Sequence, residues 1–318
     1  MAETFNPQPV FIAGPTAVGK SEIALLLAER LGGEIISADS MQVYRGLDLG
    51  TAKPSPADRA RVPHHLIDIC NLTEAFDAAQ FVRLAQKAVA EIQARGRVPV
   101  FCGGTGLYFK AFLSGLGEAP SANPELRAKL EALPFEALLR ELRERDPVAY
   151  EKIDKQNPRR VIRAVEVIRL TGKKFSQQRA EWKSEIRSPQ STVHSPRSEL
   201  FCLIRAAEDL RRRIDMRVDA MFARGLVEET RELLRHGLAE NQTAMQAIGY
   251  RQVVEHLRGE RSLAETIELV KIRTRQFAKR QLTWFRRQLE PEWIELQPDE
   301  SPQNASREIC SVIQKRIG

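Results

Sequence analysis

The chain has 318 residues, of which 42% are hydrophobic and 29% are charged, and its formal net charge is +7. This is typical of a globular protein with two domains, or one large domain with an insertion, and no apolar run approaches the length of a membrane span. The four cysteines form no C-x-x-C pair, so neither a zinc site nor a disulfide framework is indicated, and a reducing compartment is expected.

The excess of positive charge lies beyond the first third of the chain. Residues 1–113 hold 11 basic and 11 acidic side chains, whereas residues 114–200 and 201–318 carry net charges of +4 and +3. Two segments concentrate this charge, Lys155–Lys174 and Lys271–Arg287, each with seven basic residues. One such cluster is as often a solvated helix face as a binding surface, but two of them, the second with interleaved aromatic residues, favour a nucleic-acid partner.

The first third of the chain alternates apolar strands with amphipathic helices. Val10–Ala13 runs through a glycine-rich loop into the helix Glu22–Leu31, whose apolar side chains recur at helical spacing. The other elements expected in this part are the strands Glu34–Ala38, Leu66–Cys70 and Val98–Cys102 and the helix Phe76–Arg95. The alternation predicts an α/β fold with a parallel, doubly wound sheet.

From about residue 120 onward, nearly every segment is predicted to be helical. The expected helices are Asn123–Leu133, Phe135–Arg145, Arg159–Thr171, Glu208–His236 and Leu263–Gln288. Ser184–Ser198 is rich in Ser, Pro and charge and is predicted to be a loop, and the tail from Pro298 is expected to be weakly ordered before a last short helix. The N-terminus has no signal-peptide pattern, so the cytoplasm is the expected location.

The glycine-rich loop matches G-x-x-x-x-G-K-[ST] at every defined position, between a strand and a helix, where a phosphate-binding loop must lie. In such loops the backbone N–H groups surround a phosphate at the start of a helix, the lysine pairs with phosphate oxygens and the serine can bind Mg²⁺. The motif indicates a polyphosphate but does not specify ATP. The residues expected to bind it are Gly14, Pro15, Thr16, Ala17, Val18, Gly19, Lys20 and Ser21.

Two polar residues follow other predicted strands and should reach the same edge of the sheet. Asp39 follows Glu34–Ala38, and Thr105 lies in a glycine-rich turn after Val98–Cys102. Ligands of open α/β sheets bind at this edge. On spacing alone, Asp39 could equally be a cap or turn residue, and the Thr105 hydroxyl could satisfy the turn backbone. The adjacent His64 and His65 are interpreted as structural, because neighbours on a strand point to opposite faces.

With these motifs in place, the chain resembles the bacterial tRNA dimethylallyltransferases over nearly its whole length. The matching motifs, in order, are GPTAVGKS (14–21), DSMQVYRGLDLGTAKP (39–54), HHLID (64–68), GGTGLY (103–108), NPRRVIRAVEV (157–167), RVDAMFARGLVEE (217–229), AIGYRQ (247–252) and TRQFAKRQLTWFR (274–286). The chain has no Cys/His cluster for the zinc finger of eukaryotic members, which favours the bacterial type. The resemblance implies transfer of a dimethylallyl group from dimethylallyl diphosphate to N6 of adenosine 37, next to the anticodon.

The resemblance also implies an architecture. We expect a P-loop NTPase-like parallel sheet core with C-terminal tRNA-binding helices, made of residues 1–115 and 200–318, and a mostly helical insertion domain at 116–199. Mg²⁺ is the expected cofactor, bound through Ser21. Nothing in the sequence requires an oligomer, so a monomer is expected.

By resemblance, the catalytic residues are Asp39 as general base, Thr105 as a hydroxyl that contacts the reacting substrates, and Arg217 as an electrostatic stabiliser of the diphosphate. The residues expected to bind tRNA are Asp39, Ser40, Met41, Gln42, Thr105, Arg127, Arg159, Arg160, Val161, Ile162, Arg163, Gln246, Ala247, Ile248, Gly249, Tyr250, Arg251, Thr274, Arg275, Gln276, Phe277, Ala278, Lys279, Arg280 and Gln281. Lys271, Arg275 and Lys279 recur every fourth position and are expected on one helical face. Trp284 and Phe285 are more often core residues than a base-stacking pair.

Three alternative functions remain open on the residues alone. An adenylate isopentenyltransferase would use the same diphosphate site with a free nucleotide as acceptor, although the basic segments would then be unnecessary. A P-loop ATPase or small-molecule kinase would transfer phosphate, and an RNA-binding protein could use a nucleotide only as a switch.

Overall fold

The computed structural model describes residues 7–116, 120, 122–180 and 199–317. The chain divides into two compact units, one formed by Met1–Lys110 with Val193–Gly318 and the other by Ala111–Thr192. The second unit overlaps the insertion expected at 116–199, but its boundaries lie several residues earlier. Each unit has its own hydrophobic core.

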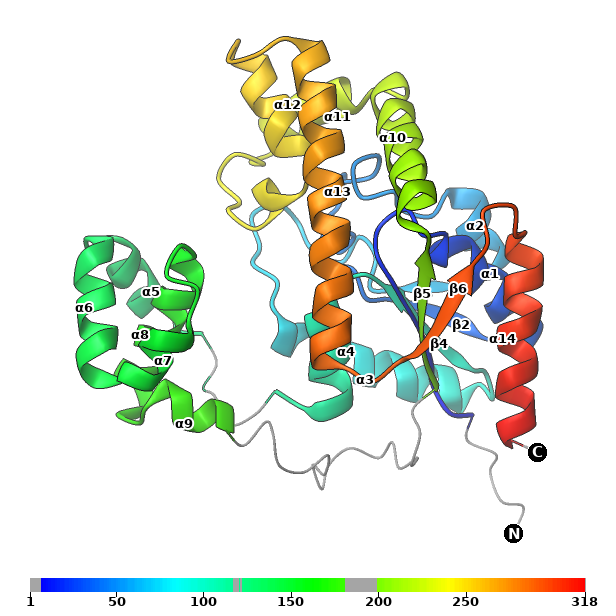
Figure 1. The fold of residues 1–318 in the computed structure, drawn as a ribbon, viewed down its shortest axis with the longest axis horizontal. Coiled ribbons are helices and arrows are strands. Elements are labelled where there is room, and N and C mark those ends of the chain that lie inside the picture. Colours follow the sequence, from blue (N-terminus) through cyan, green and yellow to red (C-terminus); the bar gives the residue numbers. More distant parts are fainter. Residues whose placement is uncertain (1–6, 117–119, 121, 181–198, 318) are drawn as a thin grey trace. The chain divides into compact units, whose positions relative to one another are not determined.

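The first unit is built on a six-stranded sheet with the order β3-β2-β4-β1-β5-β6, in which every pair of neighbours is parallel (Figure 1). This confirms the predicted α/β fold with a parallel sheet. The strands are β1 (Val10–Ala13), β2 (Glu34–Ser37), β3 (His64–His65), β4 (Pro99–Gly103), β5 (Glu199–Arg205) and β6 (Glu292–Leu296).

Helices surround this sheet on both faces. They are α1 (Lys20–Leu31), α2 (Pro56–Arg61), α3 (Ala78–Ala94), α4 (Gly106–Ser114), α10 (Ala207–Ala223), α11 (Leu226–Arg235), α12 (Tyr250–Leu257), α13 (Leu263–Gln288) and α14 (Pro302–Ile317), with the short 3-10 helix η2 (Ala244–Gln246). Strand β1 shows why both faces are covered: Ile12 packs in the core shared with α1 and α14, whereas Phe11 stacks on Phe101 and meets Phe109 of α4. Successive strand residues point to opposite faces, so a strand buried on both is apolar throughout.

One predicted strand is wrong. Leu66–Cys70 is not a strand: the ladder in this region is the two-residue β3, and the residues after it bend away before Cys70 makes an isolated bridge with Tyr44. Leu66 and Asp68 have φ values of 62° and 56°. A left-handed backbone conformation cannot continue a strand, so the apolar run misled the prediction.

The C-terminal half was also predicted as too uniformly helical. The predicted helix Glu208–His236 is two helices, because Gly225 takes a φ of 97° between α10 and α11. The prediction missed β5 and β6, which complete the sheet beside β1. The last helix, α14, is not short: it has 16 residues and packs against α1.

The second unit contains only helices among its described residues. They are α5 (Pro124–Glu131), α6 (Phe135–Arg145), α7 (Pro147–Lys152), α8 (Pro158–Thr171) and α9 (Phe175–Ala180). Leu130, Leu138 and Leu142 pack against the apolar face of α8. Asn157 caps α8 and Gly172 ends it, as expected from their positions. The predicted loop Ser184–Ser198 lies outside the described residues.

Candidate active site

The glycine-rich loop leaves β1 and enters α1, as its motif predicts. Gly19 precedes the helix with a φ of 106°, a conformation that favours glycine. The Lys20 Nζ atom donates a hydrogen bond to the Pro15 carbonyl oxygen at 3.1 Å, so its side chain folds back along the loop. Ser21 is exposed at the start of the helix.

A distant glutamine joins this loop to two other parts of the site. The Thr16 N–H donates to Gln281 Oε1 of α13 at 2.9 Å, and Gln281 Nε2 donates to the Gly104 carbonyl oxygen at 2.9 Å. A Cβ atom at Gly104 would lie 2.3 Å from Gln281 Nε2, so only glycine permits this approach. The turn that carries Thr105, the phosphate loop and α13 are therefore fixed to one another.

Arginines hold the other side of the loop. Arg213 Nε donates to the Ala17 carbonyl oxygen at 3.0 Å, and the buried Arg205 donates to the Val18 carbonyl oxygen at 2.9 Å. Sequence analysis did not single out either residue. Arg213 lies four residues before Arg217 on α10, so helical spacing could have placed both on one face.

Burial and neighbouring charges shift the pKa values of the cations beside the phosphate loop. Burial lowers the pKa of Lys20, and the neighbouring Arg217 lowers it further, whereas Asp39 opposes the shift. Burial also lowers the pKa of Arg217, again opposed by Asp39. A partly desolvated pair of cations is a favourable environment for a polyphosphate.

A cavity of about 730 Å³ brings the predicted site residues together. The phosphate-loop residues Thr16, Lys20 and Ser21 and the predicted catalytic residues Asp39, Thr105 and Arg217 all line it. The predicted tRNA-binding residues that also line it are Ser40, Met41, Gln42, Gln246, Ala247, Ile248, Thr274, Phe277, Arg280 and Gln281. These residues come from segments far apart in the chain, and the parallel strands bring several of them to one edge of the sheet.

Asp39 and Thr105 both have local partners within this cavity. Asp39 Oδ1 accepts a hydrogen bond from the Met41 N–H at 2.9 Å. The Thr105 hydroxyl oxygen accepts from the Ser40 N–H at 3.0 Å and donates to Ser40 Oγ at 3.3 Å. Each residue therefore stabilises its turn and faces the cavity, so the two interpretations left open by the sequence are compatible.

Gln42 was expected to bind tRNA, but its amide is engaged within the protein. Ser37 Oγ donates to Gln42 Oε1 at 2.8 Å, and Gln42 Nε2 donates to the Thr51 carbonyl oxygen at 3.2 Å. Its side chain connects the end of β2 to the far end of the segment 39–54.

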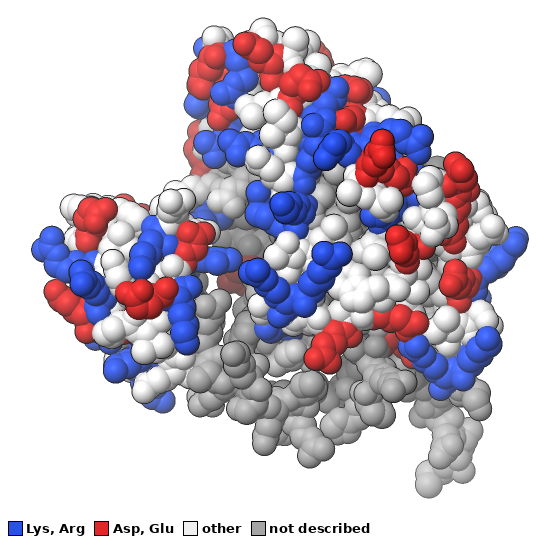
Figure 2. All heavy atoms as spheres, in the orientation of Figure 1, with Lys and Arg blue, Asp and Glu red and all other residues white. Residues whose placement is uncertain are grey.

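The basic face expected on α13 needs correction. Lys271 pairs with Asp219 at 2.8 Å and Arg275 pairs with Asp215 at 2.6 Å, so both side chains fasten α13 to α10 instead of facing solvent with Lys279. Thr274, Ala278 and Gln281 are buried. The exposed residues of this stretch are Gln276, Phe277, Lys279 and Arg280, and Lys and Arg side chains follow this face of the unit in Figure 2.

Of the aromatic pair at the end of α13, Phe285 belongs to the core, as the sequence favoured, whereas Trp284 is only partly buried. Phe285 is fully buried and meets Phe109 edge to face, at 6.1 Å between ring centroids. Trp284 lies over Gly106, where a Cβ atom would approach the indole to 2.1 Å. Phe285 is therefore not available to stack on RNA.

The expected tRNA segment at 246–251 divides into two parts. Gln246, Ala247 and Ile248 line the cavity, whereas Tyr250 is fully buried. The Tyr250 hydroxyl donates to Glu229 Oε1 at 2.6 Å and accepts from the Gly50 N–H at 3.0 Å. Tyr250 therefore supports the cavity wall from behind and does not present a surface to RNA.

In the second unit, two of the arginines expected to bind tRNA are paired. Arg127 and Arg163 each lie 2.7 Å from Glu166 Oε2, and Glu166 is fully buried. Val161 and Ile162 belong to the core. Arg159 and Arg160 are exposed at the start of α8, and Arg169 and Leu170 are exposed near its end.

Among the described residues, no group of three or more His, Cys, Asp or Glu side chains could hold a metal ion. No helix of that part of the chain combines the length and apolar character needed to cross a membrane.

The parallel sheet and the loop between β1 and α1 define the chain as a P-loop-like α/β protein, with Lys20 and Arg217 in the cavity beside this loop. The sequence model of the family described as "IPP transferase" matches residues 42–288. The chain belongs to this family.

Similar proteins cover nearly the whole chain. It is 47% identical over 294 residues to tRNA dimethylallyltransferase 1 of Trichlorobacter lovleyi, covering 91% of this chain and 94% of the relative, and 48% identical over 284 residues to the tRNA dimethylallyltransferase of Halorhodospira halophila, covering 87% and 89%. The crystal structure of the tRNA isopentenylpyrophosphate transferase of Bacillus halodurans is 39% identical, with a TM-score of 0.70 and coverage of 97% and 96%. A eukaryotic dimethylallyltransferase, crystallised acting on tRNA, is 26% identical, with a TM-score of 0.77 and coverage of 98% and 79%.

Proposed function

We propose that this protein transfers the dimethylallyl group of dimethylallyl diphosphate to N6 of adenosine 37 in tRNA, giving N6-dimethylallyladenosine and diphosphate. Family membership and the relatives named tRNA dimethylallyltransferase support this proposal. The single observation that carries it is one continuous cavity, which holds a phosphate-loop lysine, an arginine and a carboxylate together.

On the donor side, the leaving group is the diphosphate. As the allylic C–O bond breaks, negative charge accumulates on the diphosphate oxygens, and Lys20, Arg217 and the loop amides stabilise it electrostatically. Mg²⁺, when bound, would neutralise part of the same charge. Ser21 offers a hydroxyl at the start of α1, and Mg²⁺ sites commonly use one or two protein oxygens with substrate phosphates and water, so the residues present fit this ion.

On the acceptor side, the exocyclic amine of adenine is a weak nucleophile. The C–N bond forms as the allylic C–O bond breaks, and the Asp39 carboxylate accepts the proton that N6 loses. The Thr105 hydroxyl accepts a hydrogen bond from Ser40, the neighbour of Asp39, and so lies where it can orient the reacting groups. The base must leave its stack to enter the cavity, and the exposed Phe277 and Arg280 line the cavity and can guide the RNA there.

The experiment is prenyl transfer from labelled dimethylallyl diphosphate with Mg²⁺ and unmodified tRNA, AMP or no acceptor, in the absence of ATP. We expect label on tRNA only. We also expect the enzyme to be a monomer and to act in the cytoplasm. Label on AMP alone would indicate an adenylate isopentenyltransferase. Turnover of ATP without label on RNA would indicate an ATPase or a kinase, and tRNA binding with neither reaction would indicate an RNA-binding switch.

A further inference from the structure

The segment Asp39–Pro54, which we call the acceptor loop, forms much of the cavity wall although it contains only turns and a single bridge to Cys70. Both of its ends line the cavity, through Asp39–Gln42 and Gly50–Pro54. A long irregular segment has many accessible conformations, and fixing each residue costs about 1–2 kcal/mol of conformational entropy. Specific interactions must therefore hold it in one arrangement.

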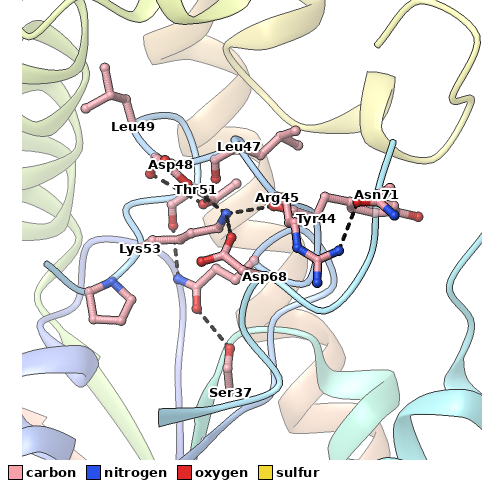
Figure 3. A network of polar contacts seen from close by, with 12 residues as sticks. Ser37, Tyr44, Arg45, Leu47, Asp48, Leu49, Thr51, Lys53, Asp68 and Asn71 are labelled. Carbon is pink, nitrogen blue, oxygen red and sulfur yellow. Dashed lines mark hydrogen bonds and ion pairs between the residues drawn. The ribbon is translucent and has the colours of Figure 1, made fainter. Parts of the chain in front are cut away.

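The centre of this loop is a buried ammonium group (Figure 3). Lys53 Nζ donates to the Tyr44 carbonyl oxygen at 2.6 Å, to Asp48 Oδ1 at 2.7 Å and, by a shorter contact, to Asp68 Oδ1. Its side chain is 2% exposed. An ammonium group has three N–H donors, so these three oxygens satisfy it completely.

Two carboxylates compensate the charge of Lys53: Asp48, within the acceptor loop, and Asp68, which follows β3. Burial opposes ionisation of Asp68, but hydrogen bonds from Lys53 and Arg59 outweigh it and hold the pKa of this carboxyl below its ordinary value. Arg59 Nη1 lies 2.8 Å from the other Asp68 oxygen. Each carboxylate oxygen of Asp68 therefore has a cationic partner, Lys53 for one and Arg59 for the other.

A short path connects this cluster to the predicted general base. Asp68, held by Lys53, donates its backbone N–H to the Gln42 carbonyl oxygen at 3.1 Å. Gln42 follows Met41, whose N–H donates to Asp39 Oδ1 at 2.9 Å. The position of the carboxylate therefore depends on the backbone that the Lys53 cluster fixes.

The Gln42 side chain closes the loop from the opposite direction. It accepts from Ser37 at the end of β2 and donates to Thr51, two residues before Lys53. The lysine and the glutamine together join the beginning, the middle and the end of the loop.

We propose that Lys53 is a positioning residue for the acceptor reaction: it presets the acceptor loop, and with it Asp39, before the RNA binds. This rests on the function proposed above. Lys53 does not act as a phosphate ligand, since its three N–H donors are engaged and its side chain is buried, whereas Lys20 holds the diphosphate.

The test compares K53M with wild type and with K87M. Lys87, on α3, has a side chain that is 72% exposed, so K87M is a matched control for loss of a lysine charge. Steady-state transfer is measured with varied dimethylallyl diphosphate and varied tRNA, and rates are normalised to folded enzyme. We expect K53M to lower kcat at least tenfold and to leave the KM of the donor within twofold, whereas K87M changes neither.

A second measurement does not depend on activity. Amide hydrogen exchange in residues 41–52 should accelerate at least tenfold in K53M, while exchange in residues 14–21 stays as in wild type. D48N tests the same cluster more gently, because Asp48 is 57% exposed and asparagine keeps an acceptor oxygen, and it should lower kcat about threefold.

Three outcomes would overturn the proposal: a raised donor KM with unchanged kcat, which would make Lys53 a phosphate ligand; an equal loss in kcat and donor affinity, which would show that Lys53 supports the donor and acceptor sides of the cavity alike; or unchanged exchange in residues 41–52. If wild type transfers no prenyl group to tRNA, the proposed function fails, and the exchange measurement still decides whether Lys53 fixes the loop.

Discussion

The phosphate loop Gly14–Ser21 and the acceptor loop Asp39–Pro54 both leave the carboxyl edge of the sheet and line the same cavity, but they are held in different ways. The phosphate loop is short and continues directly into α1. Its backbone donates a hydrogen bond to Gln281 and accepts hydrogen bonds from Arg205 and Arg213. The acceptor loop is twice as long, and the contacts that hold it include the Lys53 ion pairs, Glu229 of α11 and the Tyr250 hydroxyl of α12.

The proposed function accounts for this difference. A diphosphate is recognised by backbone N–H groups and a lysine, which a short motif can supply wherever a strand meets a helix. A purine base needs a shaped wall, which here depends on tertiary contacts such as Glu229 with the Leu49 N–H at 3.0 Å. Substitutions that disturb one loop should therefore affect either the use of the diphosphate donor or the reaction of the tRNA acceptor, but not both.

The largest effect is expected at the reacting carboxylate. Asp39→Asn keeps the oxygen that accepts from the Met41 N–H, so the turn should persist, but it removes the proton acceptor. We expect the single-turnover rate of transfer to fall by ~10² or more with tRNA affinity nearly unchanged. A large loss of tRNA binding would instead assign Asp39 to the structure of the acceptor loop.

The next largest effect is expected when the side chain that joins the phosphate loop to α13 is removed. Gln281→Leu leaves the buried Thr16 N–H and the Gly104 carbonyl without this partner, and an unsatisfied buried group costs about 1–3 kcal/mol. We expect the donor KM to rise roughly tenfold, since 1.4 kcal/mol corresponds to a factor of ten. Gln276→Leu, at an exposed position of the same helix, is the control and should leave donor KM unchanged.

A smaller effect concerns the RNA surface on α13. Lys279 is exposed, so Lys279→Ala should weaken tRNA binding several-fold and reduce the slope of log affinity against log salt by about one unit. Lys271→Ala is the matched control, because Lys271 is engaged with Asp219 and should contribute little to that slope. Equal slopes for Lys279→Ala and wild type would assign this face of α13 to a role other than phosphate binding.

The smallest effect is a pH dependence of the acceptor loop, which arises from Asp68 and is seen only in acid. Because the pKa of Asp68 is lowered in the folded protein, its contribution to stability is present above the ordinary Asp pKa of about 3.9 and is lost as pH falls through the folded value. Hydrogen exchange, corrected for its intrinsic pH dependence, should therefore accelerate in the acceptor loop below about pH 4. The phosphate loop should not respond, and Asp68→Asn should abolish the pH dependence in the acceptor loop.

Residues that act through local sequence could be predicted. The phosphate loop lies where its motif places it, and Asp39 and Thr105 reach the cavity because they follow parallel strands. Helices with clear caps, such as α8 and α13, were predicted within one residue. The strand β6 was missed because its partner, β5, lies far away in sequence and only their pairing distinguishes it from a helix or a loop.

The charged residues show the limit of prediction most clearly. Spacing correctly indicates that Lys271, Arg275 and Lys279 recur along α13, but only the packed structure shows that Asp219 and Asp215 of α10 pair with the first two. The sequence by itself determined the phosphate loop, because this loop is formed by contacts between neighbours in the chain. The tertiary structure alone decided which cations of α13 stay exposed and which residues fix the acceptor loop, because these depend on partners that packing brings together.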